Sequence, residues 1–202
     1  MAKGRFFRDA LARFLIVGDR FREEVRGVAA VEFAFIAPIM ILLFVGTIEL
    51  SAGVATNRKL SRLSSTIGDL ITQSQTLTTN DIDNIMDVSS KIMYPYKDPV
   101  TIIVTGIDIN SSGQAKVKWS RSEPTGSAKA TGSNYTVPTK IKKANTFLVA
   151  AEVLTSYTPS FGWAHYEANK GVYFSRTPIA MKEQLFLRPR IGGSVCLDGT
   201  SC

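Results

Sequence analysis

Few side chains in this 202-residue sequence are spaced as catalytic groups usually are. The chain has one histidine, His165, and it lacks the serine elbow, the Walker loop, the HExxH helix and the paired CxxC motif of common enzymes. His165 lies between Trp163 and Tyr166 in a predicted aromatic loop, where packing is favoured over metal ligation. We therefore predict no enzyme, no cofactor and no metal site.

Three acids are the remaining catalytic candidates: Asp81, Asp83 and Asp87. They fall on a short predicted helix, and acids near a helix start are stabilised by the helix dipole. A pair of these acids used for hydrolysis is the less favoured alternative.

Two cysteines, Cys196 and Cys202, enclose Leu197 to Ser201 near the end of the sequence. Gly192, Gly193 and Gly199 give the backbone freedom to close such a loop. On the oxidising side of a membrane, a disulfide between them is expected.

Glu32 is placed unusually, because it lies inside the start of an apolar run. The stretch from Val28 to Ile48 has 21 residues, about 31 Å as a helix, and the sixteen residues between Glu32 and Glu49 carry no charge. A buried core helix seldom runs this long without polar residues, and the apolar part of a signal peptide is shorter. We predict a transmembrane helix over residues 28–50.

The residues before this run set its orientation. Residues 1–26 hold seven Lys or Arg against four Asp or Glu, which places the N-terminus in the cytoplasm by the positive-inside rule. Arg58, Lys59 and Arg62 lie beyond the run and weaken this argument. The leader is either a basic amphipathic helix on the inner face of the membrane or an unstructured segment.

The order of a basic leader, Gly27, four small or aliphatic residues, Glu32, Phe33 and an unbroken apolar helix resembles the class III signal of type IV pilin-like proteins. The longer string RGVAAVEFAFIAPIMILLFVGTIEL is similar to the N-terminus of TadE-like minor pseudopilins of the tight adherence (Flp) pilus. Pro38 and the pair Glu49 Leu50 match positions where that family commonly has a proline and an acid followed by an apolar residue.

The resemblance implies that a prepilin peptidase cleaves after Gly27, so that Val28 becomes the new N-terminus. The new α-amine is mostly cationic near neutral pH and needs an anion in a medium of low dielectric constant. Glu32 lies one helical turn away and would pair with this amine or with that of an adjoining subunit. Alternatively, Glu32 reaches the headgroups of an uncleaved anchor.

Two further residues of the span have open roles. Pro38 removes a backbone hydrogen bond and should kink the helix. This kink either helps assembly or is tolerated, as prolines are in many membrane helices. Glu49 is expected at the outer interface, where an acid costs little, and the resemblance adds a subunit or partner contact.

Beyond the span, residues 51–74 keep helical spacing of apolar residues and predict an amphipathic stalk. Residues 75–202 are expected to form an outer α+β domain in which the stalk packs on a small antiparallel meander. Its predicted parts are a short helix after Thr78, Thr79 and Asn80, a hairpin over 101–119, a long mobile loop over 121–138, a strand over 147–157 and a broken edge strand over 172–187.

The net charge of +7 includes the leader, and without residues 1–27 it falls to +4. The remaining lysines, such as Lys116, Lys118 and Lys140, show no pattern of stacked aromatic residues beside them, so nucleic-acid binding is not expected. The expected function is that of a minor pseudopilin of the inner membrane, with its C-terminal part in the periplasm. Its expected partners are the prepilin peptidase, other pilins and pseudopilins, and the assembly platform, with no small-molecule substrate. The alternative is an uncleaved single-pass protein whose outer domain binds a partner in the envelope.

Overall fold

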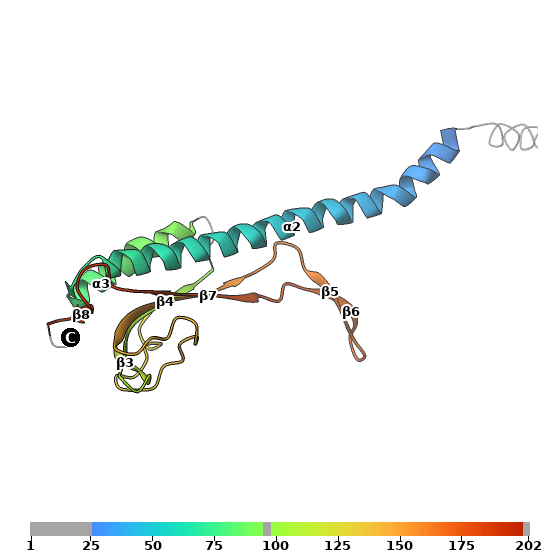
Figure 1. Ribbon diagram of the computed structural model, residues 1–202. Coiled ribbons are helices and arrows are strands. Elements are labelled where there is room, and N and C mark those ends of the chain that lie inside the picture. Colours follow the sequence, from blue (N-terminus) through green and yellow to red (C-terminus); the bar gives the residue numbers. More distant parts are fainter. Residues whose placement is uncertain (1–25, 95–97, 200–202) are drawn as a thin grey trace, which may run out of the picture. The chain divides into compact units, whose positions relative to one another are not determined.

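The computed structural model describes residues 26–94 and 98–199. Its elements are α2 (Arg26–Thr72), β1 (Thr76–Leu77), α3 (Thr79–Ser90), the 3-10 helix η1 (Lys91–Met93), β2 (Val100–Ile109), β3 (Ala115–Glu123), β4 (Thr146–Tyr157), β5 (Trp163–Glu167), β6 (Gly171–Ser175), β7 (Ile179–Leu187) and β8 (Cys196–Leu197). A long helix followed by an antiparallel sheet confirms the predicted α+β class (Figure 1).

The chain divides into two units, residues 1–48 and residues 49–202. The described part of the first unit is entirely helical, and its large apolar side chains are exposed. The second unit begins inside α2 and contains all the strands. Its part of α2 ends at Thr72, two residues before the predicted end of the stalk.

The main sheet has four antiparallel strands in the order β3-β2-β4-β7. Because β4 pairs with β2 and not with β3, the sheet is not the simple meander that the sequence suggested. The predicted hairpin is confirmed, with Ile109 opposite Ala115. The predicted break before β7 is also present, and β7 is an edge strand.

The stalk part of α2 packs on one face of this sheet. Leu60, Leu63, Ile67 and Ile71 recur at helical spacing and are fully buried. They share one core with alternate residues of β2 and β4, namely Ile102, Val104, Val149, Ala151 and Val153. The side chain of Ser64 also donates a hydrogen bond of 2.9 Å to the carbonyl of Ala151.

One glycine of the stalk lies close to the sheet. A Cβ atom at Gly68 would lie 2.3 Å from a methyl carbon of Leu187 and 3.6 Å from the Cβ of Ala151. The Leu187 side chain therefore occupies the space that a side chain at Gly68 would take, and it would have to move aside for any larger residue there.

The opposite face of the sheet is covered by the segment that we predicted as a long mobile loop. Residues 121–123 belong to β3, so the prediction was wrong there, because Ile102 and Ile103 extend the pairing to Glu123 and Ser122. Farther on, the amide of Tyr135 donates to the carbonyl of Ala115 at 2.9 Å, and Val137 is buried in a second core with Ile107 and Leu148. This segment is thus held on the sheet by hydrogen bonds and apolar packing.

The segment that holds Trp163, His165 and Tyr166 is strand β5 and not an aromatic loop. Tyr166 lies opposite Val172 in β6, and Gly171 takes a positive φ of 72° at the turn. An aromatic residue opposite a β-branched one favours strand pairing. The glycine after Asn169 and Lys170 is the turn signal that could have predicted this hairpin.

The C-terminal segment returns to the far end of the stalk. The amide of Arg190 donates to the carbonyl of Thr72 at 2.9 Å, and the indole N–H of Trp119 donates to the carbonyl of Val195 at 2.7 Å. Strand β8 then pairs in parallel with β1. Two very short strands of this kind give too little periodicity to be predicted from sequence.

One buried carboxylate makes the stability of this unit depend on pH. Glu152 in β4 is paired with Lys182 of β7 at 2.9 Å and accepts a hydrogen bond from the hydroxyl of Tyr135. Burial alone would raise its pKa, but these hydrogen bonds and the charge of Lys182 outweigh burial and hold the pKa below the ordinary value of 4.5.

We predict that Glu152 stabilises the fold fully above about pH 4.5 and that this contribution is lost as the pH falls through the lowered pKa of the folded state. Urea unfolding of the full chain in detergent, at a series of pH values, measures the free energy of unfolding. In Glu152→Gln this acid-dependent part of the curve should flatten, whereas Glu123→Gln, at an exposed position, should leave it unchanged. An unchanged curve in Glu152→Gln would contradict the assignment.

Candidate functional site

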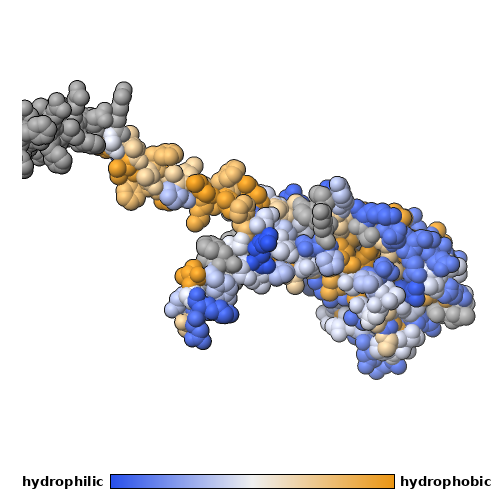
Figure 2. Space-filling model, turned by 180° about the vertical axis from the view of Figure 1, so that it is seen from behind, coloured by the Kyte–Doolittle hydropathy of each residue, from blue (hydrophilic) through white to orange (hydrophobic). Residues whose placement is uncertain are grey.

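The segment with the most distinctive chemistry is the first half of α2. Among the described residues, this is the one helix long and apolar enough to cross a membrane. Its side chains are exposed on all sides, with Phe33 70% and Phe44 67% exposed, and Figure 2 shows the apolar colour along it. A helix that is apolar all round is typical of a membrane span or of a segment that packs against other helices.

The predicted processing and assembly residues lie at the start of this helix. Gly27 and Val28 follow its first residue, Arg26, and are exposed. Glu32 and Phe33 are exposed as well, and Glu32 lies one turn after Val28. The structure thus brings the acid close to the residue that cleavage would make the N-terminus. The leader residues 1–25 lie outside the described residues.

Pro38 lies inside α2, and the helix continues past it. Figure 1 shows the ribbon bending within the blue part of α2. The pyrrolidine ring removes one backbone hydrogen bond, which is a common cause of such bends.

Glu49, the first residue of the second unit, is only 4% exposed. One carboxylate oxygen accepts a hydrogen bond of 2.7 Å from the hydroxyl of Tyr157, and the other accepts one of 3.0 Å from the amide of Phe161. Tyr157 is the last residue of β4 and is itself buried. We call these three residues the Glu49 latch.

The expected position of Glu49 at the outer interface stays a prediction, but the latch shows that the protein itself buries this acid. A buried carboxylate is costly unless hydrogen-bond donors replace its water, and here a phenol and an amide do so. The latch holds the start of the stalk to the end of β4. Its partners were missed because they lie 108 and 112 residues away in sequence, and no local pattern marks them.

The three acids considered for catalysis have structural partners. The carboxylate of Asp81 accepts a hydrogen bond of 2.9 Å from the amide of Thr78, and the Thr78 hydroxyl accepts one from the amide of Asp81, which is a capping box for α3. The Asp81 carboxylate also accepts a hydrogen bond of 2.7 Å from the Thr78 hydroxyl, and the amide and this hydroxyl together lower the pKa of Asp81. Asp83 pairs with Arg121 at 2.7 Å, and Asp87 pairs with Lys91 at 3.1 Å.

The end of the chain contributes a second carboxylate to α3. Asp198 accepts hydrogen bonds from the amide and the hydroxyl of Thr79 at 2.9 and 2.6 Å, and these lower its pKa. Cys196 is buried in β8, whereas its predicted partner Cys202 lies outside the described residues. The disulfide between them stays a prediction. Within residues 26–94 and 98–199, no cluster of His, Cys, Asp and Glu could hold a metal ion.

Two hollows lie along the stalk and share Arg58 and Arg62, and one of them also includes Ile92 of η1. Leu50 and Val54 contribute exposed apolar surface to one of them. The full linings are Leu50, Ser51, Val54, Ala55, Arg58, Lys59 and Arg62 for one, and Arg58, Ser61, Arg62, Ser65, Thr66 and Ile92 for the other. This face combines cations with apolar side chains and is suited to contact another helix.

We predict that Tyr157→Phe lowers the free energy of unfolding by about 1.5–3 kcal/mol, because a buried carboxylate loses one of its donors. Glu49→Ala should cost at least as much, since it leaves the Tyr157 hydroxyl and the Phe161 amide unpaired. Urea unfolding of the full chain in detergent provides the measurement. Tyr94→Phe, at a side chain 81% exposed, is the matched control and should change little. Equal effects of the two tyrosine variants would refute the latch.

Comparison with protein families gives one match. The family model described as TadE-like protein matches residues 27–66, which is the segment that contains Gly27, Glu32, Pro38 and Glu49. Comparisons with curated proteins and with solved structures gave no match. The resemblance to TadE-like proteins of the tight adherence pilus is therefore confirmed over the apolar helix and most of the stalk.

Proposed function

We propose that the protein is a minor pseudopilin that takes part in assembly of a tight adherence (Flp) pilus, by helix packing and subunit contacts and not by catalysis. The observation that carries this proposal is the apolar, fully exposed first half of α2 within the segment that matches TadE-like proteins. Before assembly, this helix would lie in the inner membrane, with the N-terminus cytoplasmic and residues 49–202 in the periplasm.

The stalk would connect the membrane helix to the rest of residues 49–202. The latch holds Glu49 to the end of β4, and the buried stripe continues the attachment to Ile71. The two hollows with Arg58 and Arg62 leave a second side of the same helix available for neighbouring pilins or for the assembly platform.

The prepilin peptidase is the proposed processing partner, and mass spectrometry of the mature protein tests this step. We expect Val28 as the first residue, and we expect Gly27→Leu to stay uncleaved because a peptidase that grips the backbone leaves little room for a side chain. Gly46→Leu, inside the same helix with no neighbour within 4 Å of the new Cβ, should be cleaved normally. An intact leader in the unchanged chain would indicate a single-pass anchor and overturn the proposal.

Substitutions at Glu32 should distinguish an effect on assembly from an effect on processing. Glu32→Gln removes the charge without adding volume, so insertion and at least partial cleavage should persist while pilus formation falls. The reason is that loss of one partner from a buried ion pair costs about 3–5 kcal/mol. Glu32→Asp should be intermediate, because it keeps the charge but has a shorter side chain.

Piliation and adherence are measured in a strain in which deletion of this protein abolishes both. Normal piliation with Glu32→Gln would show that the acid acts only as a membrane-interface residue.

A further inference from the structure

The β5–β6 hairpin stands apart from the main sheet. Its strands pair only with each other, from Trp163 opposite Ser175 to Glu167 opposite Gly171, whereas β4 and β7 on either side in sequence belong to the four-stranded sheet. Figure 1 shows the hairpin set off from the other strands. An isolated two-stranded hairpin is at best marginally stable in water, so this one needs a further contact.

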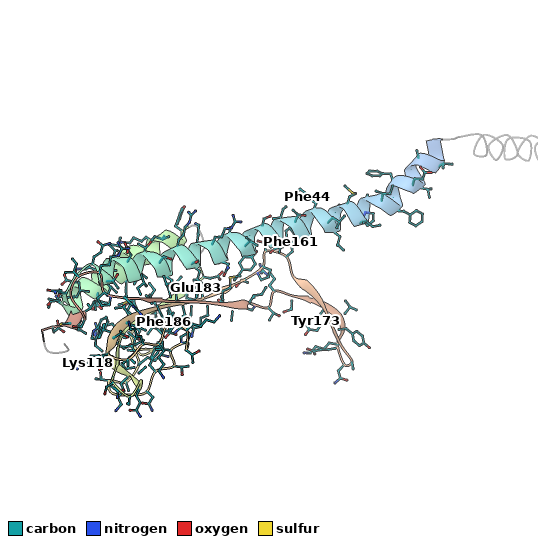
Figure 3. The ribbon with its side chains drawn as sticks, in the orientation of Figure 1. Phe44, Lys118, Phe161, Tyr173, Glu183 and Phe186 are labelled. Carbon is teal, nitrogen blue, oxygen red and sulfur yellow. The ribbon has the colours of Figure 1, made fainter. Side chains whose placement is uncertain are left out.

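Polar groups gather near the turn of the hairpin. Tyr173 donates a hydrogen bond of 2.6 Å to the carboxylate of Glu167, and Lys170 pairs with the same carboxylate at 2.9 Å. The ammonium of Lys170 also lies 5.8 Å from the centre of the Tyr173 ring. These groups satisfy one another at the turn end of the hairpin, where Figure 3 labels Tyr173.

On the other face, near the turn, a pair of large side chains is exposed. Side chains alternate between the faces of a strand, so Tyr166 and its partner Val172 project opposite to Tyr173. Tyr166 is 75% exposed and Val172 is 68% exposed. Tyr166 and Val172 are thus large side chains that lie mostly in contact with solvent.

The base of the hairpin is fixed beside the end of the apolar run. Phe161, labelled in Figure 3, lies two residues before β5, and its amide donates to the carboxylate of Glu49. Glu49 directly follows Ile48, the last residue of the 21-residue apolar stretch. Phe161, whose side chain is 51% exposed, is thus held within hydrogen-bond distance of the point where that stretch ends.

We propose that the β5–β6 hairpin lies on the outer surface of the bilayer that α2 crosses, with Phe161, Tyr166 and Val172 in the headgroup region. The proposal rests on the membrane insertion of α2 in the proposed function. Tyrosine is favoured at this depth because its ring is apolar and its hydroxyl remains wet. Arg176, directly after β6, adds a positive charge that favours anionic lipids over a second copy of the same positively charged chain.

Quenching of tryptophan fluorescence by brominated lipids tests this contact. The full chain is placed at one copy per nanodisc in phosphatidylethanolamine and phosphatidylglycerol, with bromine near the glycerol end of the acyl chains. The signal added by Val172→Trp, relative to the unchanged chain, should fall about twofold, as expected for a side chain buried 5–10 Å into the headgroup boundary. Tyr166→Trp, a smaller change of shape, should give the same result and guards against misfolding of the first variant.

Two control positions make the outcome decisive. Ile191→Trp, 54% exposed and next to the residue that bonds Thr72, should not be quenched. Phe44→Trp, inside the apolar run, should be quenched strongly by bromine deeper in the chains. Unquenched signals at 172 and 166 with a quenched signal at 44 would overturn the hairpin contact alone.

An unquenched signal at 44 as well would overturn the membrane insertion on which both proposals depend. Shielding of the hairpin only in discs that hold two copies would identify a second copy as its partner and refute the lipid contact.

Discussion

The apolar stripe of the stalk, which one face of the main sheet keeps out of water, is the contact on which the rest of the structure depends. Leu60, Leu63, Ile67 and Ile71 place their side chains in one line because a helix returns to the same face every three or four residues. The covering strands β2 and β4 are the two central strands of the sheet. Burial of this line makes half of α2 part of a folded unit, while the other half remains exposed.

Polar contacts then decide where this packing begins and ends. At its start, the Glu49 carboxylate accepts hydrogen bonds from the Tyr157 hydroxyl and the Phe161 amide, which replace those it would make with water. At its end, the carbonyl of Thr72 accepts a hydrogen bond from the amide of Arg190. Nearby, the Asp198 carboxylate accepts one from the amide of Thr79, the first residue of α3. Each site satisfies a group that burial or a helix end would otherwise leave unpaired. Hydrogen bonds therefore hold both ends of the stalk to the rest of the unit.

Local periodicity explains what could be predicted from the sequence. The apolar run before Glu49, the stripe after it, the hairpin around Asn110 and the strand ending at Tyr157 each carry their signal in neighbouring residues. The strand order, the parallel β1–β8 pair and the latch join residues that are far apart in sequence, and such contacts leave no local pattern. The processing residues were predicted by resemblance, and the structure adds only that Val28 and Glu32 lie one turn apart on an exposed helix.

The stalk is held to the sheet at several points along its length, and this has a mechanical consequence. From Glu49 to Thr72 the contacts extend for about 35 Å along the helix axis. Tension transmitted along α2 would load these contacts in shear, so that the latch, the apolar stripe and the Ser64 hydrogen bond resist together and do not open one after another. A domain loaded in this direction can bear a pull on its helix without being peeled away from it, which is a useful property for any subunit drawn into or held within a filament.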